Sequence, residues 1–401
     1  MTKRALLVGS SFSAAPIFFE LKRRGHHVSV CGSAPADPCH QYADQSFYID
    51  YSDRDALLAL VEAEHFDYLV PTCNDFSYMS CAWVAERCGF AGFDRYPVAT
   101  ILHTKNAFRE VMEKHALRSP NSRRLAANAT VGPSGMRFPL LVKPVDSFSG
   151  RGVTKIADAA ELPAALRAAQ QASRSGEAVV EEFVEGRLFS HSAFIRGQTV
   201  AADFFVDEYC TVYPYQVNCS HHPSSLSLAL QAAVRAEMTR LVEVLGLADG
   251  LLHTQFICDG ENFWIIECMR RCPGDLYGHL VELSTDVPYA DFFVRPFIGE
   301  ELPTTWAAEQ SKPVGRHTIS TDRKLVSYEF ACQVPDAQVR IVPLKNSGEV
   351  LSPAPFDKLA IVFAEFSSAE SMMAYSPRLA EFVTYYPHPL SGASLREGKP
   401  S

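Results

Sequence analysis

One segment of the chain, VKPVDSFSGRGV, gathers the side chains that hold phosphate groups. Lys143 ends an apolar run, and the loop after it contains Ser147, Ser149, Gly150 and Gly152. Glycines let backbone N–H groups converge on phosphate oxygens, hydroxyl groups add donors, and a lysine supplies a positive charge. The segment fits a phosphate-covering loop, although a flexible surface hairpin with an incidental lysine has the same composition.

A second segment, VVEEFVEG, places carboxylates where an apolar strand ends. The backbone groups of Glu182 and Val184 are suited to pair with an adenine edge, and the Glu181 carboxylate can accept a hydrogen bond from the adenine amino group. Together with the lysine loop, this strand end predicts a nucleotide site.

A third segment adds a metal-binding carboxylate and positive charge. HTQFICDGENFWIIE reads as a β-hairpin with its turn at Asp259 and Gly260, and Glu267 lies near the end of its second strand. The sequence ECMRRCPGD then brings Arg271 and Asp275 close behind Glu267. Asp275 is a candidate metal ligand, and a turn-capping carboxylate is the alternative.

Composition limits the class of protein. The chain has 401 residues, 47% of them hydrophobic, and a formal charge of -9, which argues against nucleic acid as a partner. No signal peptide is evident and no apolar run approaches the roughly 18 residues of a membrane helix, so we expect a cytoplasmic protein with no membrane partner. The 11 scattered cysteines suit reduced thiols, and we favour packing over metal binding for Cys268 and Cys272.

The elements that position these segments divide into three regions. Residues 1–95 alternate strand and helix and predict a parallel α/β domain, in which Asn74 and Asp75 follow a strand and can line a substrate crevice. Gly9 begins a strand-to-helix turn without the three-glycine spacing of a dinucleotide loop, so NAD binding is the weaker interpretation. Residues 96–300 form an α+β region with a small subdomain at about 115–187. Residues 301–401 are β-rich, and their last segment, SGASLREGKPS, is predicted to be disordered.

These motifs, in this order, resemble the ATP-grasp superfamily, and the domain ahead of them looks like that of biotin carboxylase, carbamoyl-phosphate synthase and amino-acid ligases. The resemblance implies two α+β subdomains that close on ATP. It matches Lys105 and Lys143 to the lysines on the nucleotide, Ser147–Gly152 to the mobile loop, and Glu181, Glu182 and Val184 to the adenine hinge. It matches Glu267 to the main magnesium ligand and Arg271 to the arginine that stabilises transition-state charge.

The resemblance also implies a reaction. A substrate carboxylate would be activated by ATP as an acyl phosphate and transferred to an amine, with ADP and phosphate released; amino-acid or peptide ligation is one version. The implied cofactors are ATP and Mg²⁺, or Mn²⁺ in its place, and the partners are small carboxylates and amines. A homodimer is the candidate assembly because two-fold oligomers are the commonest.

The metal shell departs from the family pattern. Gln255 stands where a second carboxylate is usual, and Met269 stands where an asparagine is usual. A thioether is a poor ligand for a hard cation. We favour a rearranged site in which Gln255, Asp275 or water helps Glu267; the alternative is a catalytically weakened nucleotide-binding protein with a regulatory or scaffolding role.

Other positions keep two interpretations each. Leu188 stands where a ribose-binding glutamate is usual, so Glu185 is either its replacement or a solvated turn residue. His221 and His222 either face the substrate or are partly solvated before a helix. Arg270 either binds a substrate carboxylate or forms an ordinary ion pair.

Overall fold

The computed structural model describes residues 2–129, 135–146, 151–304, 310–326, 328–346 and 348–387. The described residues fall into two compact units. The first comprises residues up to Glu208 together with His222–Lys312, and the second comprises Tyr209–His221 together with residues from Pro313 onward.

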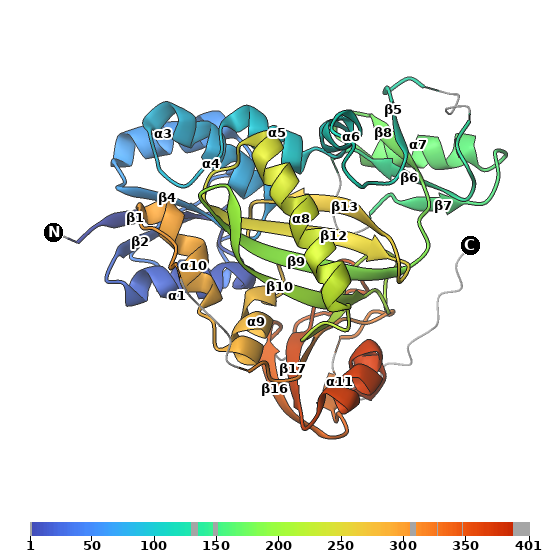
Figure 1. Ribbon diagram of the computed structural model, residues 1–401. Coiled ribbons are helices and arrows are strands. Elements are labelled where there is room, and N and C mark those ends of the chain that lie inside the picture. The colour runs from blue at the N-terminus through green and yellow to red at the C-terminus, as the bar shows by residue number, and fades with distance from the viewer. Residues whose placement is uncertain are drawn as a thin grey trace. The chain divides into compact units, whose positions relative to one another are not determined.

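The N-terminal part of the first unit is the predicted parallel α/β layer. Its strands, in the order β3-β2-β1-β4, are β1 (Arg4–Val8), β2 (His27–Cys31), β3 (Gln45–Phe47) and β4 (Tyr68–Pro71). Its helical elements are η1 (Phe12–Ala14), α1 (Ala15–Arg23), α2 (Pro38–Tyr42), α3 (Arg54–Glu64) and α4 (Asp75–Cys88). Figure 1 shows α3 and α4 on one face of this sheet and α1 on the other. Gly9 has φ +122°, and a Cβ there would lie 2.1 Å from Thr72 Oγ1, so the turn after β1 requires glycine.

Two helices lead from this layer to a small α+β subdomain. They are α5 (Tyr96–His103) and α6 (Lys105–Lys114). The subdomain has the strand order β5-β8-β6-β7 with β5 (Ser122–Leu125), β6 (Leu140–Pro144), β7 (Thr154–Ile156) and β8 (Ala178–Glu182), and α7 (Leu162–Ala172) packs its apolar face on this sheet.

The central sheet of the first unit carries the predicted hairpin. Its strands follow the order β13-β12-β9-β10 and are β9 (Arg187–Arg196), β10 (Thr199–Tyr209), β12 (Gly250–Cys258) and β13 (Phe263–Met269). Helix α8 (Leu228–Leu245) lies across these strands (Figure 1) and ends at Gly246, whose φ of +60° matches the predicted stop. Phe189, Phe205 and Phe256 pack with Val234 and Met238 of α8 to form the core on that face.

The opposite face of this sheet carries polar side chains beside the buried Phe194 and Phe204. Strand register places Gln255 directly between Ser190 and Glu267, and it places His253 between Ser192 and Met269. The segment after β13 continues through α9 (Tyr277–Thr285), α10 (Tyr289–Val294) and η2 (Arg295–Ile298). The sheet therefore presents one apolar face to α8, and its other face carries the polar side chains of Gln255 and Glu267.

The second unit is β-rich, as the sequence predicts. Its strands are β11 (Cys219–His222), β14 (Val314–Ile319), β15 (Tyr328–Cys332), β16 (Ala337–Pro343), β17 (Ala360–Phe366) and β18 (Val383–Pro387). The strand order is β11-β14-β17-β16, β15 pairs with β18, and the helical elements are α11 (Ala369–Tyr375) and η3 (Ser376–Phe382). The predicted disordered tail lies outside the described residues. Among the described residues, no helix combines the length and apolar content needed to cross a membrane.

Candidate active site

A buried carboxylate ties the small subdomain to the central sheet. Lys143 Nζ on β6 donates to Glu181 Oε2 at 2.5 Å, and Arg109 Nε on α6 donates to Glu181 Oε1 at 2.9 Å. Arg109 Nη2 also donates to the Ile266 carbonyl at 2.6 Å, next to Glu267. Burial alone would raise the pKa of Glu181, but the two cations lower it to about 2.

The ion-pair cluster gives the Glu181 carboxylate two protein partners. The residue is 1% exposed and pairs with two cations. It thereby fixes the position of Lys143, and its contact with adenine stays a prediction. Sequence reasoning assigns no role to Arg109. The signal that could have identified it is its position four residues after Lys105, which places both side chains on the same face of a helix.

Lys105 lies among the other charged residues of the predicted site. Burial lowers the pKa of its ammonium group, nearby Glu267 opposes this shift, and Lys143 reinforces it. Asp75 and Glu181 act on the same ammonium group and raise its pKa. Charged residues from α4, β6, β8 and β13 thus lie close enough to Lys105 on α6 to act on its ammonium group, and both signs of charge suit a polyanionic ligand with a metal ion.

The metal candidates supply hard oxygen donors but no closed cage. Glu267 on β13 is directly opposite Gln255 on β12, so the two side chains emerge on the same face. Met269, two residues after Glu267 on β13, is buried. Across the parts of the chain that the structure describes, no three His, Cys, Asp or Glu side chains form a metal cluster. A carboxylate and an amide oxygen fit Mg²⁺ that takes its remaining ligands from nucleotide phosphates and water.

Arg271 is held by an aspartate of the N-terminal layer. Its Nε and Nη2 donate to the two carboxylate oxygens of Asp75 at 2.9 and 3.0 Å. His103 Nδ1 lies 2.8 Å from the same carboxylate, and His103 Nε2 accepts from the Arg270 N–H at 3.3 Å. Burial acts to raise the pKa of Asp75, but Arg271 and His103 hold it well below its ordinary value.

Arg270 forms the ordinary ion pair rather than a substrate contact. Its side chain is 2% exposed, and its Nε donates to Asp94 Oδ2 at 2.8 Å. Asp94 also accepts from the Tyr78 hydroxyl at 2.9 Å and from the Ala248 N–H at 2.8 Å. This network fastens the N-terminal layer to the central sheet.

Comparison with known proteins identifies a family domain in this part of the chain. Residues 136–277 match the family model described as an ATP-grasp domain. These residues are an ATP-grasp domain. The chain is 26% identical over 323 residues to a formate-dependent phosphoribosylglycinamide formyltransferase of Synechococcus sp. (strain CC9311), covering 77% of this chain and 79% of the relative.

Two solved structures share the fold of nearly the whole chain. An L-amino acid ligase from Bacillus licheniformis has a TM-score of 0.79 at 18% identity and covers 97% of this chain and 99% of its own. A phosphoribosylglycinamide synthetase from Anaerococcus prevotii has a TM-score of 0.76 at 17% identity and covers 97% of this chain and 100% of its own. At these identities the likeness establishes the fold alone.

The remaining residues of the predicted ATP-grasp hinge lie beside β8. The Glu182 carboxylate accepts from Asn121 and Arg137, and the Glu182 N–H donates to the Asn121 carbonyl at 2.9 Å. The adenine role of Glu182 stays a prediction. The Val184 N–H donates to no backbone carbonyl of the described residues. Glu185 is exposed. The adenine role of Val184 and the ribose role of Glu185 stay predictions.

The predicted phosphate loop is described only at its ends. Ser147, Ser149 and Gly150 lie outside the described residues. Gly152 has φ +74°, and a Cβ there would lie 2.8 Å from the Ala172 Cβ, so this end of the loop accepts only glycine. At the other end, Asp146 accepts from the N–H groups of Arg174 and Ser175, both at 3.0 Å.

Other candidates have mixed outcomes. Asp275 has φ +56° and its N–H donates to Ser13 Oγ at 3.2 Å, in a turn. His221 and His222 are buried in β11, so the expectation of partly solvated histidines is wrong. Asn74 caps α4 by accepting from the Phe76 N–H at 2.9 Å. Cys268 and Cys272 are buried free cysteines, which fits packing.

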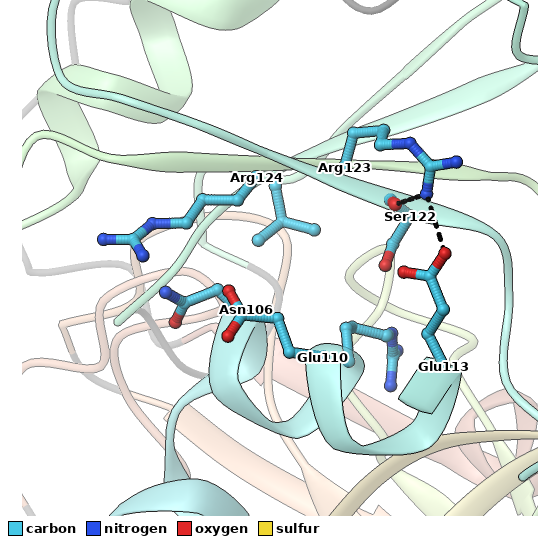
Figure 2. Close-up of a pocket in the computed structure, with 8 residues that line it drawn as sticks. Asn106, Glu110, Glu113, Ser122, Arg123 and Arg124 are labelled. Atoms are coloured by element: carbon cyan, nitrogen blue, oxygen red, sulfur yellow. Dashed lines mark hydrogen bonds and ion pairs between the residues drawn. The ribbon is translucent and has the colours of Figure 1, made fainter. Parts of the chain in front are cut away.

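A pocket of about 360 Å³ lies beside α6 and β5, apart from the predicted nucleotide residues. Figure 2 shows Glu110 and Glu113 on the helix facing Arg123 and Arg124 on the strand, with Arg123 paired to Glu113 at 3.6 Å. Lys105, Lys143 and Glu267 are not among its lining residues. Its solvated charges of both signs give no reason to assign it a ligand.

Proposed function

We propose that this protein is an ATP-dependent ligase that activates a carboxylate as an acyl phosphate and transfers the acyl group to an amine. The observation that carries the proposal is the gathering of Lys105, Lys143 and Glu267 around one position, with Arg271 aimed by Asp75. Cations of this kind are needed because both the attacking carboxylate and the γ-phosphate are negatively charged.

The proposed reaction has two steps. A carboxylate oxygen attacks the γ-phosphorus while the bond to the ADP oxygen breaks, so ADP leaves and an acyl phosphate remains. The amine nitrogen then attacks the acyl carbon, and phosphate departs as the nitrogen loses its proton. Lys143, whose position Glu181 fixes, would contact the nucleotide phosphates. Arg271 would stabilise the negative charge on the acyl phosphate and on the tetrahedral oxyanion.

Magnesium bound through Glu267 and Gln255 would offset the charge of the phosphate oxygens. Lys105 would add a further cation beside the phosphates. The residue roles in this scheme follow the family resemblance together with the contacts described above.

The substrates to try first come from the relatives. The formyltransferases are named for formate, the smallest carboxylate, and the ligase of similar fold is named for amino acids. We propose a small carboxylate and a primary amine, with amino-acid ligation as one version. Phosphate release should be measured with formate and with pooled amino acids, each with and without an amine acceptor.

Two variants decide between catalysis and nucleotide binding alone. Lys143→Ala and Glu267→Ala should each abolish substrate-dependent phosphate release. Arg137→Ala, which removes an exposed partner of Glu182, is the matched control and should retain it. If the wild-type chain binds ATP but releases no phosphate with any substrate pair, the regulatory alternative that Gln255 and Met269 raise replaces the ligase.

A further inference from the structure

Glu208 is a buried carboxylate that neither the motifs nor the family resemblance singles out. It lies on β10 and is 4% exposed. Its Oε2 accepts a hydrogen bond from Gln255 Nε2 at 2.5 Å. Gln255 stands where the family usually has a second metal-binding carboxylate. The negative charge that position 255 lacks is therefore present on Glu208, which contacts Gln255.

The sheet register puts all three side chains on one face. Glu267, Gln255, Ser190 and Val206 lie opposite one another on β13, β12, β9 and β10. Glu208 follows Val206 by two residues and therefore emerges on the same face. Asp207, between them, points to the other face, where it accepts from the Ser225 N–H at 3.0 Å and pairs with Arg187.

The strand order then fixes which end of the amide faces which neighbour. In the order β13-β12-β9-β10, Glu208 and Glu267 approach Gln255 from opposite sides. A carboxylate only accepts hydrogen bonds, so it holds the NH₂ end of the amide. The amide oxygen of Gln255 is consequently the end that does not contact Glu208.

We propose that Glu208 is a positioning residue for the metal: it orients Gln255 so that the amide oxygen, a neutral hard ligand, complements the Glu267 carboxylate. The inference rests on the proposed ATP-dependent function and deepens it, because the site keeps two carboxylate charges while only one of them is a direct ligand. A glutamate at position 255 would instead place its charge against Glu208, which explains why an amide stands there.

The test is the affinity for Mn²⁺ of the full-length chain in the presence of ADP, measured from the electron paramagnetic resonance signal of free Mn²⁺. Glu208→Gln replaces a carboxylate that only accepts by an amide that also donates, so position 208 no longer selects the NH₂ end of Gln255. This variant should weaken Mn²⁺ binding about tenfold or more, the usual effect of losing a residue that orients a ligand. Asp207→Asn, a buried carboxylate of the same strand on the other face, should leave Mn²⁺ affinity unchanged.

The exchange variant Glu208→Gln/Gln255→Glu is the decisive test of the positioning role. It keeps one carboxylate and one amide in contact but presents the carboxylate to the metal, so it should restore Mn²⁺ affinity to within about threefold of wild type, well inside the tenfold loss of the single variant. Wild-type affinity in Glu208→Gln, or a folded exchange variant without restored affinity, would overturn the inference alone. Should Glu208→Gln fail to fold, the exchange variant decides by itself. If the wild-type chain itself binds no Mn²⁺ with ADP, the proposed function falls as well.

Discussion

Arg270 and Arg271 are neighbours in the chain, and each pairs with an aspartate of the N-terminal layer, but their surroundings differ. The Arg270 and Asp94 side chains are 2% and 1% exposed, and Asp94 is saturated by Tyr78 and the Ala248 backbone. The Arg271 and Asp75 side chains are each 15% exposed and lie beside Lys105 and Glu267. One pair is enclosed by protein, and the other lies among the charged residues of the candidate site.

The difference teaches how one strand end serves two purposes. Arg270 and Arg271 follow directly after β13, and the bend there turns the first side chain to Asp94 and the second to Asp75. His103 links the two pairs, since it contacts the Asp75 carboxylate and accepts from the Arg270 backbone N–H. Anchoring Arg270 therefore also fixes the backbone from which Arg271 projects.

Breaking the enclosed pair should have the largest effect. Arg270→Met leaves the Asp94 carboxylate buried without its cation, and we expect a loss of about 3–5 kcal/mol in the free energy of unfolding, measured by urea titration. The double variant Arg270→Met/Asp94→Leu removes both charges and should recover part of that loss. An Arg270→Met protein as stable as wild type would show that the pair is not an anchor.

The site pair should respond in activity instead. Arg271→Lys keeps a positive charge near Asp75 but loses the planar fork that binds a carboxylate on two atoms. We expect kcat/KM to fall on the order of 10²-fold, as when one preorganised donor is lost from an active site. Unfolding should change far less than in Arg270→Met; equal losses of stability in the two variants would erase the distinction between the pairs.

Removing the carboxylate that aims Arg271 should have a smaller effect. Asp75→Asn retains the shape of the side chain but not its charge, and a hydrogen bond to a charged group is worth about 1.5–3 kcal/mol. We expect kcat to fall roughly ten- to a hundredfold, while the KM for ATP stays near the wild-type value. A rise in the KM for ATP with unchanged kcat would place Asp75 in nucleotide binding rather than in aiming Arg271.

The sequence predicts the elements of this site better than their pairings. Apolar periodicity predicts the parallel layer, α8 and the β12–β13 hairpin, because local pattern and chain stops such as Gly89 and Gly246 determine them. The partners of Arg270 and Arg271 lie 176 and 196 residues away. A charge on one strand end has many possible partners at such separations, and only the folded layers choose among them.

The same limit explains why the ion pairs of Glu181 and the contact of Glu208 were not predicted. The cations beside a carboxylate at a strand end are not evident from the sequence, and Glu181 pairs with Lys143 and Arg109. Glu208 reaches Gln255 only because β10 and β12 flank β9, an order that the sequence does not state. The roles of Val184, Glu185 and the loop from Ser147 to Gly150 stay predictions.

Acid should have the smallest effect on the site pair. In the folded chain the pKa of Asp75 lies well below its ordinary value of 3.8, so Asp75 contributes stability that is fully present above that value and is lost only as pH falls below it. The difference in unfolding free energy between wild type and Asp75→Asn should therefore change by less than about 0.5 kcal/mol between pH 8 and pH 5. Urea titrations across that range measure it. A difference that shrinks already between pH 7 and pH 5 would mean that the carboxylate takes up a proton there, which a bidentate pair with Arg271 does not allow.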